Sequence, residues 1–563
     1  MNYKSQVAAA IKSQFDIGLE TIEKLIEIPP NSEMGDYTFP CFEVAKINRR
    51  DPNIIAKDLQ ANIKSDMFEK IENIGPYLNF FINREIFIKN TLEEIIFKGD
   101  NYGKSDIGLG KTICIEYLSP NMCKEFGVEN LCHAVLATVL SKLFEKEGYN
   151  VKVINHIKDW EQQLGNLIYS YIRWGDEEAL EKNMVGEVLR IYHKFKKEAE
   201  KDILINIEGK KYFKALEEGN IKAISIWNRF KYLSLKEFKE AHNAFSIRTD
   251  SNLEESFYNN KVKVEIDKLK EKNLLDDIYG VKVIKLHKYN MPPAIVLRSD
   301  DIQIDIIKDL TAAVYKKEKY DFYKSIYVSG INKSLYFKQL FKVLELSGYE
   351  WENDCLYVGA GLIKVTDKSV LIRNDKSSTW KNMIQQVSSI ILEAINEKNP
   401  TLENKKEIIK KLAIGEVIFT ILNDSREKNI VFNFNKKLLI EGERILYVQN
   451  VYNSARFILS NDIEISKNTN FNKLNSQDEF ELVKRLENFN SIIHIAVEKL
   501  DPSVIIKYVI EVTKELNKFY SSHLILSLED KDLMKARLVL VEATCKVIKN
   551  ALDLIGVEVV ENI

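Results

Sequence analysis

Apolar residues recur at helical spacing through much of the chain, and shorter stretches of alternating apolar residues predict strands. Near the N-terminus the helical pattern covers residues 4–28 and 54–70, with the turn-rich stretch Pro29–Tyr37 between them. The stretch Gly75–Phe81 begins with Gly-Pro and continues with apolar alternation, which is typical of a turn leading into a strand. We therefore expect residues 1–85 to form a small domain of their own.

A strand, a helix and a second strand are predicted in succession in the next part of the chain. Residues 86–110 favour a helix followed by a glycine-containing connector, and residues 112–117 favour a strand. A helix over 131–147 ends before Gly148, and a second strand covers 151–155. This arrangement implies a right-handed crossover and a parallel sheet. Additional strands are predicted at 281–286, 294–297 and 325–328.

Helical patterns dominate two long regions of the remaining sequence. Residues 165–275 are helical and heavily charged, as expected of helices with one face in solvent. From about residue 386 onward the pattern is almost entirely helical, and the last helix, 533–554, ends at Gly556. A chain of 563 residues is too long for one hydrophobic core. We divide it into residues 1–85, 86–110, 111–385 and 386–563.

Composition and charge restrict the class of protein. Hydrophobic residues make up 45% of the chain and charged residues 29%, which is ordinary for a soluble globular protein. No apolar run is long enough to span a bilayer, and the N-terminus lacks the basic start and apolar block of a secretory signal. We therefore expect a cytoplasmic protein without membrane contact. The net charge of −2 means that any nucleic acid must bind to local basic patches.

The six cysteines include no Cys-x-x-Cys pair, although Cys114, Cys123 and Cys132 are spaced by nine residues. Nothing near these three completes a zinc-type pattern, so we predict no metal site. Buried thiols in a reducing compartment are the expected state.

The most informative motif covers residues 116–133 and reads Glu-Tyr-Leu-Ser-Pro-Asn-Met-Cys-Lys-Glu-Phe-Gly-Val-Glu-Asn-Leu-Cys-His. It resembles the ATP-binding segment of class I arginyl-tRNA synthetases, in which Ser-Pro-Asn is followed by a lysine and then by His-Ile-Gly-His. Lys124 matches the lysine. The two histidines and the glycine are replaced by Gly127, Asn130 and Glu129. Further similar segments lie in order along the chain: Met34–Tyr37, Gly75–Phe81, Asn155–Trp160, Glu255–Tyr258, Phe337–Gln339, Ala536–Leu538 and Lys549–Leu554.

The resemblance covers nearly the whole chain and implies a multidomain α/β fold of the class I synthetase type. Residues 1–85 would be a small N-terminal α/β domain that contacts tRNA, and residues 86–110 a connector. Residues 111–385 would form a Rossmann-like catalytic domain with helical insertions. Residues 386–563 would form an all-α anticodon-binding bundle.

The resemblance also implies chemistry in which the carboxylate of arginine attacks the α-phosphate of ATP and pyrophosphate leaves. Such a site needs donors for the charge that builds on phosphate oxygens, and losing one donor typically costs about 3–4 kcal/mol. Glu129 instead places a carboxylate beside the phosphates. The positions of the family's second, lysine-rich signature hold Lys368, Ser369 and Arg373. These changes argue against use of ATP and Mg²⁺, and no other cofactor is implied.

Two loops that line the active site of the family have also gained charge. The family's Gly-Asp-Trp-Gly is Lys158-Asp159-Trp160-Glu161 here, and its Ser-Asp-Gly is Ser299-Asp300-Asp301. Each replaced glycine position now carries a charged side chain, which changes what the loop presents to a ligand.

The amino-acid pocket of the family is matched more closely. A guanidinium needs planar carboxylate or amide partners, and the resemblance assigns these roles to Glu255, Asp309 and Gln339. Asp305 replaces a tyrosine one helical turn before Asp309, so both carboxylates share a helix face and the pocket becomes more negative. Groups near the α-amino and carboxylate ends of the amino acid are matched by Ser119, Asn121 and His156.

Contacts with tRNA are implied near both ends of the chain. The N-terminal candidates are Tyr77, Asn79 and Phe81, although the two aromatic residues could equally belong to the core. Asn450 replaces an aromatic residue, and stacking of a base on such a ring is typically worth about 1–3 kcal/mol. The candidates of the C-terminal bundle are Gln449, Asn450 and Arg537.

Three functions remain open at this point. The first is a synthetase-like monomer that binds tRNA, and arginine or a related cation, with ATP-dependent aminoacylation lost or strongly impaired. The second is an active arginine–tRNA ligase in which Lys124, Lys368 and Arg373 hold ATP in a shifted position and Glu129 recruits Mg²⁺. The third is a pocket repurposed for another guanidino or cationic ligand.

Overall fold

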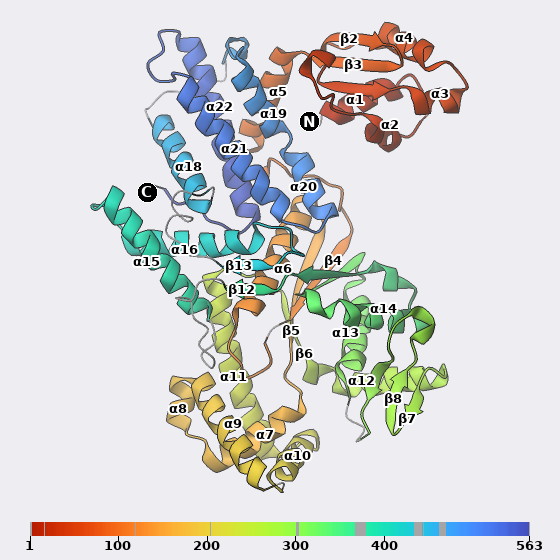
Figure 1. Ribbon diagram of the computed structural model, residues 1–563, viewed down its shortest axis with the longest axis vertical. Coiled ribbons are helices and arrows are strands. Elements are labelled where there is room, and N and C mark those ends of the chain that lie inside the picture. The colour runs from red at the N-terminus through yellow and green to blue at the C-terminus, as the bar shows by residue number, and fades with distance from the viewer. Residues whose placement is uncertain are drawn as a thin grey trace.

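The computed structural model describes residues 3–15, 17–118, 120–202, 204–299, 303–365, 379–432, 442, 444–460 and 469–561. A small N-terminal domain lies beside a C-terminal helical bundle, and a central parallel sheet separates this bundle from a group of inserted helices (Figure 1). Within the described part of the chain, no helix combines the length and the apolar character that crossing a membrane requires.

The N-terminal domain contains a three-stranded antiparallel sheet in the order β1-β3-β2. The strand expected near residues 75–81 is confirmed as β3 (Tyr77–Ile82), whose buried Leu78 and Phe80 face the domain core. The helix expected over 4–28 is instead two helices, because the chain turns after Lys12, where the Ser13 hydroxyl donates to the Ala10 carbonyl. The other elements are α1 (Tyr3–Lys12), α2 (Leu19–Leu25), β1 (Tyr37–Pro40), α3 (Phe42–Asn48), α4 (Pro52–Asn62) and β2 (Phe68–Ile74).

The central sheet has five strands, all parallel, in the order β11-β10-β4-β5-β6. The strands expected at 112–117, 151–155 and 325–328 are confirmed as β4, β5 and β10. Two strands of this sheet escaped sequence prediction; β6 is only four residues long, and Leu253 is its one apolar side chain. The bounds are β4 (Thr112–Leu118), β5 (Asn150–Ile157), β6 (Ser251–Glu254), β10 (Lys324–Gly330) and β11 (Cys355–Ala360).

The strands expected at 281–286 and 294–297 exist but lie outside the parallel sheet. They are β8 (Val281–Ile284) and β9 (Ala294–Leu297), which pair antiparallel with each other. β7 (Asp276–Ile278) completes this small sheet by pairing with β8. A short apolar run predicts a strand but not which other strand it pairs with. The sequence therefore could not show that these strands form a separate sheet.

Helix α6 (Val128–Lys146) connects β4 to β5 and is buried along nearly its whole length. One side contacts the central sheet, and the other contacts helices of the C-terminal bundle, α16 (Lys405–Leu422), α20 (Phe489–Glu498) and α22 (Lys531–Leu554). A helix covered on both sides must be apolar all round, which explains the nearly continuous apolar sequence of α6.

Helices fill the long charged region and the C-terminal part, as expected. The region 165–275 is helical except for β6, and the C-terminal region also includes β13 (Ile430–Phe432), which pairs with β12 (Ile363–Val365). Helix α5 (Arg84–Lys98) packs against α19 and α22, so it joins the bundle by contact. The remaining helices are α7 (Gln162–Trp174), α8 (Glu177–Lys182), α9 (Met184–Lys201), α10 (Leu204–Glu217), α11 (Ile221–Ala244), α12 (Glu255–Glu271), α13 (Asp305–Tyr320), α14 (Ser334–Leu346), α15 (Trp380–Lys398), α18 (Ile445–Leu459), α19 (Gln477–Glu487) and α21 (Ser503–Ser522).

Helix α22 shows how local chemistry sets its ends. It begins at Lys531, two residues before the expected start, because the Asp530 carboxylate accepts hydrogen bonds from the backbone of Asp532 and Leu533. It ends before Gly556, whose φ of +77° is a conformation that glycine adopts without strain. All six cysteines are buried and free, as the spacing suggested.

Candidate active site

The candidate site lies at the carboxyl edge of the central sheet. Glu116 is near the end of β4, His156 is near the end of β5, and Glu255 follows β6 directly as the first residue of α12. The carboxyl edge of a parallel sheet is where ligands bind in open α/β folds, because strand ends and following loops converge there. Helix α13 adds Asp305 and Asp309 to the same edge.

His156 is fully buried between three carboxylates. Its Nδ1 lies 3.4 Å from Glu116 Oε1, and its Nε2 lies 3.8 Å from both Glu255 Oε1 and Asp309 Oδ1. Burial alone would lower the pKa of His156, but Glu116 and Glu255 outweigh burial and raise it to about 10. The imidazole is therefore a cation at neutral pH, and it holds the three acids around it.

Three lysines pair with the same acids. Lys316 Nζ lies 2.6 Å from Glu116 Oε2, and Lys308 Nζ lies 2.9 Å from Glu255 Oε2. Lys158 Nζ lies 2.5 Å from Asp305 Oδ2 and 3.9 Å from Glu255 Oε1. Two of these contacts, Lys308 with Glu255 and Lys158 with Asp305, occupy carboxylates that the sequence assigned to a ligand.

Glu255 and Glu116 nevertheless remain charged. Burial opposes ionisation of Glu255, but His156, Lys308 and Lys158 together lower its pKa to about 2. Burial likewise opposes ionisation of Glu116, yet Lys316 and His156 lower its pKa to about 2. Asp309 differs, because burial raises its pKa even though the Tyr336 hydroxyl donates to it.

One carboxylate oxygen in this buried cluster is left without a hydrogen bond. Among the described residues, no donor lies within bonding distance of Glu255 Oε1. Buried carboxylate oxygens almost always have a donor, so an orphaned one points to a ligand that supplies it. The nearest cationic atoms, on His156 and Lys158, are 3.8 and 3.9 Å away.

The first signature forms the N-terminus of α6. Gly127 is the N-cap residue and supplies no side-chain cap, and Asn130 Nδ2 donates to the Leu118 carbonyl at 3.4 Å. Glu129 is exposed, and its Oε1 would lie 3.3 Å from a Cβ added at Gly330, at the end of β10. A carboxylate in the first helical turn is favourable for the helix, and its negative charge opposes the binding of an anion at this end.

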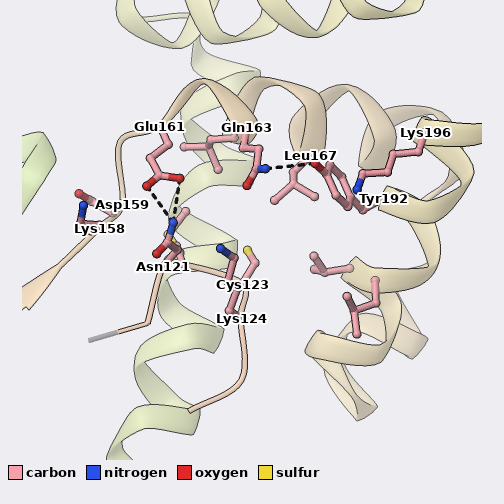
Figure 2. A pocket seen from close by; sticks show the side chains of 14 residues that line it. Asn121, Cys123, Lys124, Lys158, Asp159, Glu161, Gln163, Leu167, Tyr192 and Lys196 are labelled. Carbon is pink, nitrogen blue, oxygen red and sulfur yellow. Dashed lines mark hydrogen bonds between the residues drawn. The ribbon is translucent and has the colours of Figure 1, made fainter. Parts of the chain in front are cut away.

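The loop after β5, in which Glu161 replaces a glycine of the family, bonds Asn121, a residue predicted to bind the amino acid. Glu161 accepts hydrogen bonds from Asn121 Nδ2 at 2.8 Å on both carboxylate oxygens, as Figure 2 shows. Beside this pair is a cavity of about 200 Å³ between the loop and α9. Its lining includes Lys124, Lys158 and Lys196 together with apolar side chains of α7 and α9.

Several predicted residues lie away from the acidic cluster. Gln339 Nε2 donates to the Pro292 carbonyl at 2.9 Å, so its amide is held by the loop before β9. Lys124 is exposed and lines the cavity. The predictions for Ser119, Asp300, Asp301, Lys368, Ser369 and Arg373 fall outside the described residues.

Three of the residues predicted to contact tRNA have side chains that are buried and bonded inside the protein. Asn79 accepts a hydrogen bond from Thr38, and Gln449 bonds the backbone of Glu558 and Val560. Arg537 Nε lies 2.7 Å from Glu479 Oε1. The residues that keep accessible surface are Tyr77, Phe81 and Asn450.

Sequence reasoning missed four members of the cluster. Glu116 had a signal, because a carboxylate inside an otherwise apolar strand must find a buried partner. Its partner Lys316 lies 200 residues away, so no local pattern could join them. The other missed residues are Lys308 and Tyr336, which the structure brings to Glu255 and Asp309.

Comparisons with known proteins agree with this architecture along the whole chain. Family models match in order: arginyl tRNA synthetase N terminal domain over residues 1–82, tRNA synthetases class I (R), catalytic domain, over 91–434, and DALR anticodon binding domain over 448–563. Proteins named arginine–tRNA ligase from Clostridium beijerinckii and Clostridium botulinum are 49% and 50% identical over 561 residues, with full coverage of both chains.

Solved structures show the same fold. Arginyl-tRNA synthetase from Thermus thermophilus has a TM-score of 0.80 at 20% identity, with 100% of both chains covered. The enzyme from Plasmodium falciparum has a TM-score of 0.79 at 19% identity, with 100% of this chain and 98% of that chain covered. Since the catalytic-domain model matches more than half of the chain and full-length relatives are 49% and 50% identical to it, the chain belongs to the class I arginyl-tRNA synthetase family.

Proposed function

We propose that the protein is an arginine–tRNA ligase, which converts arginine, ATP and tRNA into arginyl-tRNA, AMP and pyrophosphate. The orphaned Oε1 of Glu255 carries the proposal, because a guanidinium is the planar donor that fits a buried carboxylate. His156 Nε2 lies 3.8 Å from that oxygen and 3.8 Å from Asp309 Oδ1, so a second carboxylate is close to the same imidazole. The names of the full-length relatives support the same activity.

The first step would form arginyl-adenylate. Glu255 and Asp309 would hold the guanidinium, which directs the α-carboxylate of arginine toward the α6 N-terminus. There the carboxylate attacks the α-phosphate, a P–O bond forms, and pyrophosphate leaves with the electrons of the broken P–O bond. The backbone N–H groups of the first turn of α6 and the exposed Lys124 would stabilise phosphate charge.

The second step would transfer the arginyl group. A ribose hydroxyl of the terminal tRNA nucleotide attacks the carbonyl carbon of the adenylate, an ester forms, and AMP leaves. Among the described residues, no three carboxylate, histidine or cysteine side chains are grouped so that they could hold a metal ion, and Glu129 is an exposed carboxylate at this end of α6. Phosphate oxygens would have to supply the remaining ligands of any ion.

A second candidate function is binding of tRNA without efficient charging. One observation favours it: Glu129 places negative charge in the first turn of α6, where the ATP phosphates would bind. Carboxylate and phosphate repel each other in a partly desolvated site, so adenylate formation would be slow. The relatives named as ligases weigh against this second candidate.

Charging and exchange assays separate the two candidates. Purified full-length protein is incubated with arginine, ATP, Mg²⁺ and total tRNA, and arginyl-tRNA formation and ATP–pyrophosphate exchange are measured. The ligase proposal expects arginine-dependent turnover that Glu255→Gln reduces by about 100-fold or more, because one guanidinium partner loses its charge. Absence of charging at micromolar enzyme, with tRNA still bound, would reject the ligase and favour the second candidate.

Calorimetry with agmatine tests whether the pocket has been repurposed. Agmatine carries the guanidinium of arginine but lacks the carboxylate that reacts with ATP. The ligase proposal expects arginine to bind more tightly than agmatine. Preference for agmatine would instead indicate a pocket that selects guanidino compounds for another purpose.

A further inference from the structure

The acidic cluster is already neutralised by the protein itself. Ion pairs of 4.0 Å or less connect eight side chains among the described residues, four carboxylates and four cations when His156 is protonated. Glu217 also faces Lys308, but it is exposed and screened by solvent. The members of the network are Glu116, His156, Lys158, Glu255, Asp305, Lys308, Asp309 and Lys316.

A cationic ligand therefore meets a site without spare negative charge. Adding a guanidinium would leave one uncompensated positive charge in a buried network, and unpaired buried charges are costly. Binding requires either that a resident cation leaves or that one loses its proton. The contacts and exposures of the four cations show which one can leave.

Lys158 is the most exposed of the three lysines in the network. Its side chain is 15% exposed, whereas those of Lys308 and Lys316 are 7% and 0% exposed. Its closest partner, Asp305, is 42% exposed at the mouth of the cluster, while Lys308 also donates to the Trp160 carbonyl at 2.8 Å. Lys158 alone among these lysines also lines the 200 Å³ cavity, whose lining includes the Glu161 carboxylate that accepts from Asn121 Nδ2.

The position of Lys158 Nζ matches what a guanidinium would need. It lies between the Asp305 carboxylate, at 2.5 Å, and the orphaned Oε1 of Glu255, at 3.9 Å. An ammonium at this point satisfies Asp305 and leaves Glu255 Oε1 without a hydrogen bond. A planar guanidinium with several donors could bond both carboxylates at once.

We propose that Lys158 occupies the guanidinium position in the free protein and that arginine displaces it into the adjoining cavity, toward Glu161. Lys158 and Asp305 then determine specificity. Lys158 opposes binding of any cationic ligand whose contacts do not offset the free energy of displacing it. Asp305 binds the ligand once Lys158 has left. The proposal rests on the proposed function, because it takes arginine as the ligand. It gives a function to Lys158 and Asp305, whose presence beside the pocket is not explained by binding of a guanidinium to Glu255 and Asp309.

Calorimetric titration of the full-length protein with L-arginine and with L-citrulline tests the displacement. Citrulline has nearly the same shape as arginine, so it also needs the position of Lys158 Nζ, but its ureido group brings no charge to replace that of the lysine. Lys158→Met should lower the Kd for arginine by at least about tenfold, and it should lower the Kd for citrulline as well, because neither side chain then has to displace the lysine. Lys158→Gln serves as a second variant if the first folds poorly, with folding checked by circular dichroism.

Two further variants make the test specific. Lys196→Met removes another lysine from the same cavity that is no member of the ion-pair network, and arginine affinity should stay within about twofold. Asp305→Asn should weaken arginine binding in the Lys158→Met background, because the guanidinium loses its second carboxylate. Equal arginine affinity in wild type and both Lys158 variants would overturn the displacement.

Proton release distinguishes displacement from deprotonation of His156. Arginine is titrated at neutral pH in buffers of different ionisation enthalpy, which reports protons released on binding. Displacement of Lys158 expects no net release, because the lysine leaves with its proton. Release of about one proton would overturn the role of Lys158 and show that His156 loses the positive charge when arginine binds. If no variant binds arginine at millimolar concentration, the proposed function itself fails.

Discussion

The pair of Lys316 and Glu116 makes a quantitative prediction about stability. Both side chains are buried, with Lys316 fully enclosed and its Nζ 2.6 Å from Glu116 Oε2. Glu116→Gln leaves the ammonium of Lys316 buried beside a neutral amide, and breaking a buried pair in this way typically costs about 3–5 kcal/mol. Replacing both partners, Glu116→Gln with Lys316→Met, removes the stranded charge and should recover most of the loss.

Differential scanning calorimetry measures the outcome. For a domain of this size, a loss of 3 kcal/mol corresponds to a decrease in Tm of about 6–12 °C. Lys316→Met alone should cost less than Glu116→Gln, because Glu116 keeps His156 as a partner at 3.4 Å. The reasoning is refuted if Glu116→Gln melts within about 2 °C of wild type. It is also refuted if the double variant is as unstable as Glu116→Gln.

Three further predictions use other parts of the molecule. Glu129→Gln should raise the rate of ATP–pyrophosphate exchange several-fold, and an unchanged rate would show that this carboxylate does not oppose ATP. The pKa of His156 rises from 6.5 to about 10 on folding, so its contribution to the free energy of unfolding is complete below pH 6.5 and declines as pH rises toward 10. The Tm of the wild type should therefore fall between pH 6.5 and 10, and the Tm of His156→Gln should fall by less over the same range. Arg537→Met should lower Tm, because the buried Glu479 then loses its partner at 2.7 Å. Loss of tRNA affinity at an unchanged Tm would instead indicate that Arg537 contacts RNA.

Three of the residues predicted to contact tRNA are buried in the fold. Asn79, Gln449 and Arg537 were chosen from a motif frame, in which a polar residue suggests a contact with RNA. Each of them instead satisfies a polar group inside the protein, Thr38, the backbone of Val560 and Glu479 respectively. The sequence does not show whether a polar side chain bonds another group of the protein or a bound RNA. Only the packing of the folded chain distinguishes the two cases.

The sequence by itself determined the order of helices and strands and the resemblance to a family. Helix α6, strands β4, β5 and β10, and the final helix α22 follow from local periodicity and capping residues, which depend on near neighbours. The segment around Lys124 and the acids Glu255 and Asp309 led to the prediction of an amino-acid pocket. These are properties of residue type and short spacing.

Only the tertiary structure decided how the charges of the site are paired. Lys158 and Asp305 are 147 residues apart, and Glu116 and Lys316 are 200 apart, yet each pair is in direct contact. Strand order and the packing of α13 against the sheet bring them together, and neither is encoded in a local pattern. In sequence, Lys158 was a charged residue in place of a glycine and Asp305 an extra negative charge. In the fold they neutralise each other, because buried charges are stable only where an opposite charge meets them.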